Sequence, residues 1–483
     1  MSALDFVSLD QAGTTPKRPV FHPGVALFSP DGSWHAAMNG GEAHASQGHG
    51  SPNDIPKGLW LTDLPFEQIG SVSSRGHYMK VESWLRPGIA TMARAWGITT
   101  APRASAASMI SRVASRIFAR VGDIAERDMQ MGIGPEDLQR ILSNSPSLTT
   151  GLAQMNAVRL NAAMPADAMV QNILKRSLQT GIYFPKWAKQ VSGMRRVEFT
   201  LPILSHAIAV TREPVPAPAV WRFAARPDDM SGNTFMSELK KGGRPAIIEA
   251  SIASITPGTP EWFESYIHGR QASIFRYHFG VGEIEAILAR GIPVQITSVI
   301  AGQDWQPSAT GILIDHLVQA AGGPLAAAAS WSINALAENI LCSAHRSLKG
   351  VETISTEALW IASRDRNLML PYIEALCDSG ARLVSAMAGV ITVEIPDDAE
   401  IMSSVLMSAW DMGMHTDMET SSSLAKDKGI KLPTDISTWG GSAVDYLPAV
   451  SSHSCNRNAL WKMDGLQDLP IGEREKVITA SLP

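Results

Sequence analysis

The stretch RYHFGVGEIEAILARGIPVQIT, residues 276–297, decides how the second half of this chain folds. An apolar run, a Gly-x-Gly pair, a helix-like segment and a second apolar run follow one another, as in a dinucleotide-binding unit. In such a unit the glycines follow a strand, and bare backbone N–H groups at the helix start hold a phosphate. Here Glu285 stands where the third glycine belongs, and Glu283 adds a second carboxylate. We therefore expect no nucleotide site in this segment.

The residues before the glycine pair favour a helix over a strand. The sequence TPE at residues 259–261 supplies a side-chain cap, a preset φ and an acidic first turn. Aromatic and aliphatic residues then recur up to Phe279. The sequence thus predicts one helix that ends at about Phe279, so that Gly280 and Gly282 join two helices.

The composition is typical of a packed protein with little charge. Hydrophobic residues make up 45% of the 483 residues and charged residues 18%, against roughly 25% charged in an average soluble domain. This low charge indicates that part of the outer surface is buried, as in an assembly. The formal charge of -5 argues against a protein whose main work is to neutralise nucleic-acid phosphates, because such binding needs clustered excess Lys and Arg.

Two further features bear on the compartment. Cys342, Cys377 and Cys455 are odd in number and far apart, which is no disulfide framework and indicates a reducing compartment. The first residues carry no basic segment followed by an apolar core, so no secretory signal is predicted. The most apolar window, residues 322–345, is interrupted by polar residues before it reaches a bilayer span. We expect a cytoplasmic or virion protein that is not secreted and has no membrane partner.

The fold class predicted from the pattern is α+β, helix-dominated, with small β-sheets or hairpins, an extended N-terminal arm and a turn-rich C-terminal tail. The predicted regions are an arm with a hairpin and a Gly/Ser/His loop over residues 1–57, a helical domain over 58–213, a Pro/Gly-rich connector over 214–258, and a mixed α/β domain with a wrapping tail over 259–483.

Within these regions the sequence predicts several individual elements. The turn PDG at residues 30–32 predicts a hairpin. Residues 197–223 are β-prone and then broken by prolines. The predicted strands are residues 293–302 and 390–395. The predicted helices are residues 104–129, 166–178, 309–318, the Ala-rich window 322–345, 356–363, 368–378, 381–388 and a last helix after the strand at 390–395.

Three arginines recur on the polar side of the helix predicted over residues 104–129. Arg112, Arg116 and Arg120 are four residues apart, so they share one helix face and are the candidate nucleic-acid contacts of the chain. The alternative is a solvated or internally paired face, since acidic residues follow closely and no aromatic row accompanies the arginines.

Two other clusters contain residue types that bind metals or catalyse hydrolysis. Zinc ligands would come from Cys342, His345, His453 and Cys455, but their spacings are poor for a zinc site. A hydrolase would use Asp411, His415, Asp417 and Glu419, which are as easily explained as solvated groups after a helix end. Because no catalytic motif is complete, we predict no catalytic residue, no metal and no cofactor.

These observations favour a structural role. The 13 Trp and 21 Met residues are of types enriched at protein interfaces, although core packing explains them equally well. We predict a self-assembling homo-oligomeric subunit, such as the capsid protein of a viral or virus-like shell, with non-specific contact to a packaged nucleic acid. The alternatives are a hydrolase with a site built from distant residues, and a nucleoprotein-like module that binds RNA or DNA.

Overall fold

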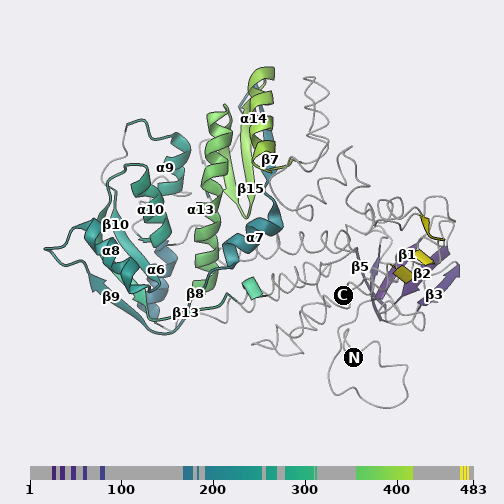
Figure 1. The fold of residues 1–483 in the computed structure, drawn as a ribbon, viewed down its shortest axis with the longest axis horizontal. Helices are drawn as coiled ribbons and strands as arrows, with labels where there is room; N and C mark the ends of the chain where they lie inside the picture. Colours follow the sequence, from purple (N-terminus) through teal and green to yellow (C-terminus); the bar gives the residue numbers. More distant parts are fainter. Residues whose placement is uncertain are drawn as a thin grey trace, which may run out of the picture. The chain divides into compact units, whose positions relative to one another are not determined.

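The protein is a mixed α and β structure with small, mostly antiparallel sheets (Figure 1). The computed structural model describes residues 24–28, 33–37, 45–49, 58–62, 77–81, 167–177, 182–183, 191–252, 257–268, 278–308, 310–312, 355–416, 468–470, 473–474 and 476–477. The chain divides into two compact units: residues 1–155, 312–339 and 443–483 form the first, and residues 156–311 and 340–442 form the second. The four regions expected from the sequence stay predictions.

The first unit contains a five-stranded sheet in the order β3-β2-β1-β4-β5. Its strands are β1 (Gly24–Phe28), β2 (Ser33–Ala37), β3 (Ala45–His49), β4 (Gly58–Thr62) and β5 (His77–Val81). Strands β1 and β2 are antiparallel, with Phe28 opposite Trp34, which confirms the hairpin around the PDG turn. The segment expected to be a Gly/Ser/His loop contains β3, because it pairs with all five residues of β2.

The second unit has one four-stranded sheet in the order β11-β10-β12-β9, which we call the β12 sheet. Its elements are β9 (Trp221–Ala225), α8 (Gly232–Gly242), β10 (Ala246–Ser251), α9 (Glu261–His268), β11 (His278–Gly280), α10 (Val281–Ala289) and β12 (Gln295–Gly302). Strands β9 and β10 both run antiparallel to β12, so α8 links two parallel strands that have a third strand between them. Helix α10 links β11 and β12 across β10 in the same way.

A second four-stranded sheet, the β15 sheet, has the order β6-β14-β15-β7. It consists of β6 (Ile182–Tyr183), β7 (Met194–Thr200), β14 (Arg382–Met387) and β15 (Val390–Pro396), all antiparallel to their neighbours. The accompanying helices are α6 (Ala168–Ser177), α7 (Ile203–Thr211), α13 (Thr356–Asp378) and α14 (Ala399–Asp411), and a two-stranded ribbon joins β8 (Val215–Pro216) to β13 (Trp305–Gln306).

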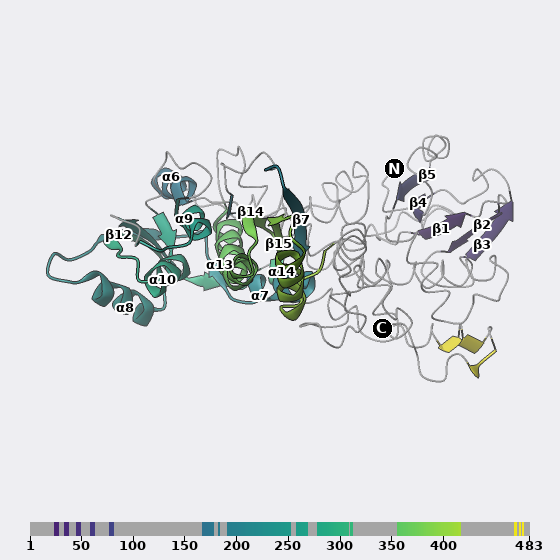
Figure 2. The ribbon, with the colours of Figure 1, turned by 90° about the horizontal axis from the view of Figure 1, so that it is seen from above.

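One hydrophobic core joins the two sheets of the second unit. Apolar side chains of β7, β14 and β15 belong to the same buried cluster as those of β10, β12, α9 and α10. Helix α13 contributes Met369, Ile373 and Leu376 to this cluster. It contacts β14, α14, β8, α7 and α10, and both ribbon views show it between the β12 sheet and the β15 sheet (Figures 1 and 2).

Helix α13 also carries buried polar side chains that bind other segments. Asp365 lies 2.6 Å from Nε2 of His206 on α7 and accepts a hydrogen bond of 2.7 Å from the backbone N–H of Ala388. Ala388 and Gly389 form the turn between β14 and β15, with φ of 54° and 75°. A turn with two positive φ angles matches the twist of a hairpin, but it costs a non-glycine residue about 1 kcal/mol. The buried carboxylate therefore holds a strained turn in place.

Several expectations from the sequence are confirmed. Helix α6 coincides with residues 166–178, β12 with the strand expected at 293–302, and β15 with the strand expected at 390–395, and α14 is the helix expected after that strand. The helices expected at residues 356–363 and 368–378 are one continuous helix, α13.

Three expectations for the second unit are wrong. Residues 203–211, inside the β-prone tract, form α7, because Ala207 and Val210 are buried and His206 bonds to α13. Residues 382–387 form β14 in place of a helix, because they pair with β15 and β6. The helix expected up to Phe279 ends at His268 in α9, and residues 278–280 form β11, where Phe279 pairs with Ile248.

Among the residues whose placement is described, none of the helices is both long enough and apolar enough to cross a bilayer.

The first prediction concerns the buried carboxylate of α13. Replacing Asp365→Ala leaves the Ala388 N–H and the His206 ring without their partner in a dry site, so we expect unfolding to become easier by about 3–5 kcal/mol. Urea denaturation followed by circular dichroism measures this. The matched control is Asp411→Ala, at an exposed position at the end of α14, which should change the unfolding free energy by less than about 0.5 kcal/mol. Equal effects of the two variants would contradict the assigned role.

The second prediction concerns the acid stability of the β15 sheet. Arg196 Nη2 lies 2.6 Å from Oε1 of the buried Glu394, and Arg382 pairs with Oε2. Burial alone would raise the pKa of Glu394, but the hydrogen bonds from Arg196 and Arg382 lower it below the usual value. Because the folded-state pKa is depressed, the carboxylate stabilises the fold above the ordinary pKa of about 4.3, and this contribution is lost as the pH falls through the folded-state pKa.

We therefore expect Glu394→Gln to have a lower free energy of unfolding than the parent chain at neutral pH. Below a pH of about 4.3, its free energy of unfolding should fall less steeply with decreasing pH than that of the parent chain. Unfolding free energies measured between neutral and acidic pH test this. Glu264→Gln, at an exposed position on α9, is the control and should follow the parent curve. An unchanged acid slope in Glu394→Gln would refute the assignment.

Candidate functional site

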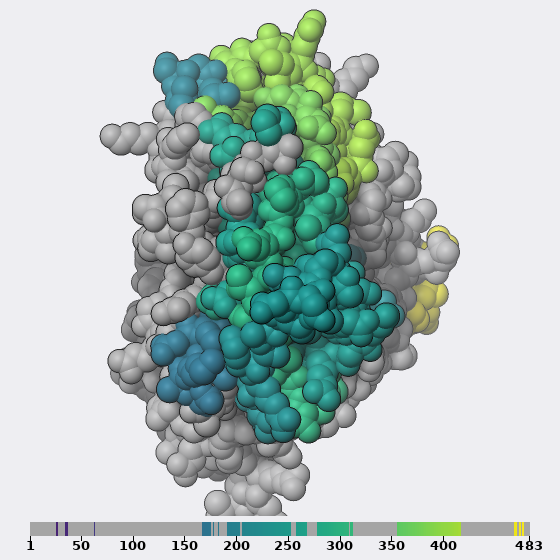
Figure 3. Space-filling model, turned by 90° about the vertical axis from the view of Figure 1, so that its left-hand side faces the viewer, coloured from purple at the N-terminus to yellow at the C-terminus, as the bar shows by residue number. Residues whose placement is uncertain are grey.

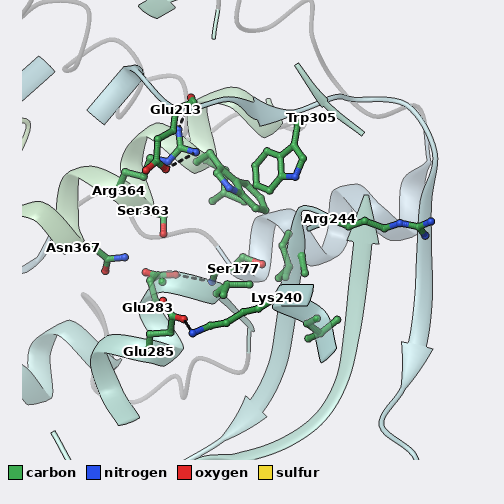
Figure 4. A pocket seen from close by; sticks show the side chains of 18 of the residues that line it. Ser177, Glu213, Lys240, Arg244, Glu283, Glu285, Trp305, Ser363, Arg364 and Asn367 are labelled. Atoms are coloured by element: carbon green, nitrogen blue, oxygen red, sulfur yellow. Dashed lines mark hydrogen bonds and ion pairs between the residues drawn. The ribbon is translucent and has the colours of Figure 1, made fainter. Parts of the chain in front are cut away.

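A cavity of about 420 Å³ opens in the second unit where the start of α10 faces α13 (Figure 4). Its walls come from α6, α8, β10, β11, α10, β13 and α13, and from the loops around Glu213 and Gly243. The lining residues on which its chemistry depends are Glu213, Lys240, Arg244, Glu283, Glu285, Trp305, Trp360, Ser363, Arg364 and Asn367. The volume is within the range of roughly 300–1,000 Å³ that is usual for small-molecule sites.

The indole rings of Trp305 and Trp360 form one wall of this cavity, and the ring of Trp221 packs against Trp360. The rings of Trp305 and Trp360 lie 6.2 Å apart between centroids at 80°, and Trp221 lies 6.2 Å from Trp360 at 55°. Trp305 donates from Nε1 to the carbonyl of Gly243 at 2.5 Å, which fixes its ring although 40% of the residue is exposed. A Cβ at Gly302 would lie 3.3 Å from the Trp221 ring, so the close approach of this ring needs glycine.

The charged groups around the aromatic wall are paired. Arg364 lies 3.4 Å from the Glu213 carboxylate and donates to the carbonyls of Glu213 and Pro214 at 2.9 and 2.5 Å. Burial lowers the pKa of Arg364, and the nearby Glu213 acts in the opposite direction. Lys240 forms an ion pair with Glu285 on the far side of the cavity (Figure 4).

Arg244 differs from the other lining cations. It is exposed, and Figure 4 shows its side chain turned away from the cavity. Each cation that faces the interior thus has its own carboxylate, and the cavity offers little net charge to a ligand.

The N-terminus of α10 is capped by the carboxylate of Glu283, which lies in the first turn of the same helix. The backbone N–H of Gly280 donates to Glu283 Oε2 at 2.8 Å, and the other oxygen pairs with Arg366. Both members of this ion pair are buried. The glycine pair follows a strand after all, since β11 ends at Gly280, but Glu283 occupies the position where a phosphate would meet the helix.

Asn367 fixes the geometry beside this helix start. Its Oδ1 accepts a hydrogen bond from the Tyr266 hydroxyl, and its Nδ2 would lie 2.8 Å from a Cβ placed on Gly282. The described lining contains serine hydroxyls but no histidine and no cysteine. Its arrangement is suited to binding and lacks the paired nucleophile and base of acyl-transfer sites.

None of the site residues predicted from the sequence is among the described residues that line this cavity. Arg112, Arg116 and Arg120 lie outside the described residues, and so do the zinc candidates Cys342, His345, His453 and Cys455. Across the part of the chain that the structure describes, no three His, Cys, Asp or Glu side chains gather as a metal site.

The hydrolase candidates are only partly described. Asp411 is exposed at the end of α14, while His415 exchanges backbone hydrogen bonds of 3.0 and 2.7 Å with Thr200. Asp417 and Glu419 lie outside the described residues. His415 therefore ties the segment after α14 to the end of β7.

The aromatic wall was not identified from the sequence. The excess of Trp over Tyr, 13 against 6, was the signal available. It could not locate the site, because Trp221, Trp305 and Trp360 are brought together only by the register of β9 with β12 and by the placement of α13.

Neither a family model nor a curated protein matches this chain. Among solved structures, Phi29 DNA polymerase complexed with primer-template DNA matches with a TM-score of 0.33 and 8% identity, over 77% of this chain and 80% of that chain. The same polymerase complexed with single-stranded DNA matches with a TM-score of 0.34, 8% identity and the same coverage. Likeness at these scores carries no argument about the fold or the activity of this chain.

The third prediction tests the ion pair beneath the cavity. Arg366→Met leaves the buried carboxylate of Glu283 without the guanidinium of Arg366, so we expect a loss of about 3–5 kcal/mol in unfolding free energy. The double variant Arg366→Met/Glu283→Gln removes the stranded charge and keeps an acceptor for the Gly280 N–H, so most of the loss should be recovered. Urea titrations of the two single variants and the double variant give the coupling energy. Strictly additive losses would contradict the pairing.

Proposed function

We propose that this chain is a structural subunit that assembles with copies of itself, as in a viral or virus-like shell, and that strand β9 supplies one of the contacts. The observation that carries the proposal is the exposed apolar edge of the β12 sheet.

Strand β9 is the edge strand of its sheet, and Figure 1 shows it at the margin of the unit. Residues 222–225 are all exposed, in contrast to the buried positions of β10 and β12. Figure 3 shows the side of the second unit on which the residues of the β12 sheet and its helices, coloured teal, form the surface. An edge strand leaves backbone N–H and C=O groups unpaired, and natural proteins usually protect such edges. Here the edge bears Phe223, which is 55% exposed.

A strained residue precedes this strand. Val220 has a φ of 48° and is 52% exposed, although β-branched residues avoid positive φ. Its carbonyl accepts a hydrogen bond of 3.1 Å from the N–H of Gln303, which holds the conformation. Strain of this kind concentrates where the surface is used for binding. Val220 and Phe223 together give the β9 edge an apolar surface.

A second copy fits this edge by symmetry. Antiparallel pairing of two β9 strands about a two-fold axis is self-complementary, because each strand presents the same groups to the other. Phe223 is the middle residue of β9, so pairing centred on it places the two Phe223 side chains opposite each other. Aromatic cross-strand pairs of this kind stabilise a sheet.

Other features support assembly beyond a dimer. The low charge content of 18% suits a subunit whose surface is covered by neighbours. In the proposal, the N-terminal arm and the turn-rich tail reach neighbouring copies, and the Arg112, Arg116 and Arg120 stripe contacts a packaged nucleic acid. The three arginines lie outside the described residues, and so do the first 23 residues and most of the tail.

The fourth prediction tests the proposal through the β9 edge. Size-exclusion chromatography with light scattering at micromolar concentration should show the parent chain as an oligomer, and electron micrographs should show regular particles. Phe223→Lys places two like charges opposite each other across the axis, so the apparent dissociation constant should rise by at least about tenfold.

The matched control is Met407→Lys, which adds the same charge at a residue 45% exposed on α14. It should assemble like the parent chain. A parent chain that stays monomeric would overturn the assembly proposal. A Phe223→Lys variant that assembles normally would remove β9 from the contact.

A further inference from the structure

We propose that the cavity beside α13 binds an uncharged small molecule that carries an aromatic or other planar ring. The ring would lie against the indoles of Trp305 and Trp360. This site is separate from the β9 contact and does not depend on assembly.

The charge distribution argues for an uncharged ligand. Arg364 is held by Glu213 and two carbonyls, Lys240 by Glu285, and Glu283 by Arg366. An ionic ligand would have to break one of these pairs or lose its hydration without gaining a partner. A neutral ligand leaves all of them intact.

The walls of the cavity argue for a ring. The indoles of Trp305 and Trp360 are in T-shaped contact, with ring planes at 80°, so together they form a continuous aromatic wall of the cavity. Leu239, Ile247 and Leu359 continue the apolar lining. Planar groups bury large apolar area at low conformational cost against such walls.

A polar group in the lining can orient the ligand. Ser363 on α13 has its hydroxyl beside the start of α10, where a Cβ on Gly280 would lie 3.2 Å from it (Figure 4). A hydroxyl both donates and accepts, so it can bind a neutral carbonyl, hydroxyl or amine. The combination of apolar walls and few polar groups is typical of small-molecule sites.

The cavity is also rigid enough to select a shape. Trp305 is held by its bond to the Gly243 carbonyl, and Asn367 is held by the Tyr266 hydroxyl. Trp360, Ser363 and Asn367 are placed three to four residues apart on one helix, so they share a face of α13.

The fifth prediction uses two fluorescent probes that differ by one charge. N-phenyl-1-naphthylamine is neutral, and 8-anilinonaphthalene-1-sulfonate carries the same rings with a sulfonate. We expect saturable binding of the neutral probe at one site per chain, at least about tenfold tighter than that of the sulfonate. Trp305→Ala should lower the affinity for the neutral probe by about tenfold or more, whereas Trp305→Phe should keep most of the affinity of the parent chain.

The control variant is Phe223→Ala, which alters the exposed edge of β9 outside the cavity and should leave probe binding unchanged. Circular dichroism checks that the Trp305 variants are folded. Equal affinity for both probes would mean that the site takes anions, and loss of binding in Phe223→Ala would place the probe on β9. Each of these two results would overturn the proposal. Unchanged binding of the neutral probe to Trp305→Ala, or no binding of it to the parent chain, would also overturn it. The assembly state of the parent chain is measured independently of these outcomes.

Discussion

The second unit depends on the buried polar side chains of α13. Glu357 accepts hydrogen bonds from Ser308 Oγ and the Thr310 N–H at 3.0 and 2.9 Å, and Asp365 and Arg366 bind α7, the β14–β15 turn and α10. Each of these groups would be costly to bury without its partner. The segments that contact α13 are therefore fixed in position by the requirement that its charges be satisfied, in addition to the apolar packing of the core.

This constraint explains features that are otherwise unfavourable. Ala388 adopts a positive φ because its N–H binds Asp365, and the hydroxyl of Thr356 donates to the Pro216 carbonyl at 3.0 Å, where a proline in β8 limits other pairing. Gly311 lies so close to the end of α7 that a Cβ added to it would be 2.4 Å from the Thr211 carbonyl oxygen. Several separate segments are thus brought to one helix at close range.

The limits of prediction from the sequence follow from the same interactions. Elements whose pattern is local were predicted: the β1–β2 hairpin, α6, β12 and β15. The tract at α7 reads as β-prone because its residues are aliphatic, and only the bond from His206 to Asp365, 159 residues away, and the burial beside α13 show why it is helical. Strand β14 was missed because its turn uses Ala388 where a hairpin signal would have Asn or Asp. The indoles of Trp305 and Trp360 in the cavity, and Trp221 in contact with Trp360, were not predicted as a site because their positions in the sequence show no spacing rule.

The two faces of α13 link the cavity to the core. Trp360, Ser363 and Asn367 line the cavity, while Met369, Ile373 and Leu376 are buried in the cluster that joins the two sheets. Between them, the adjacent residues Asp365 and Arg366 point to different partners, one to the β15 sheet and one to α10. A helix held on both sides in this way cannot rotate without breaking buried pairs, so the indole of Trp360 keeps its position. The shape of the cavity is consequently set by the core, and we expect it to be present before any ligand binds.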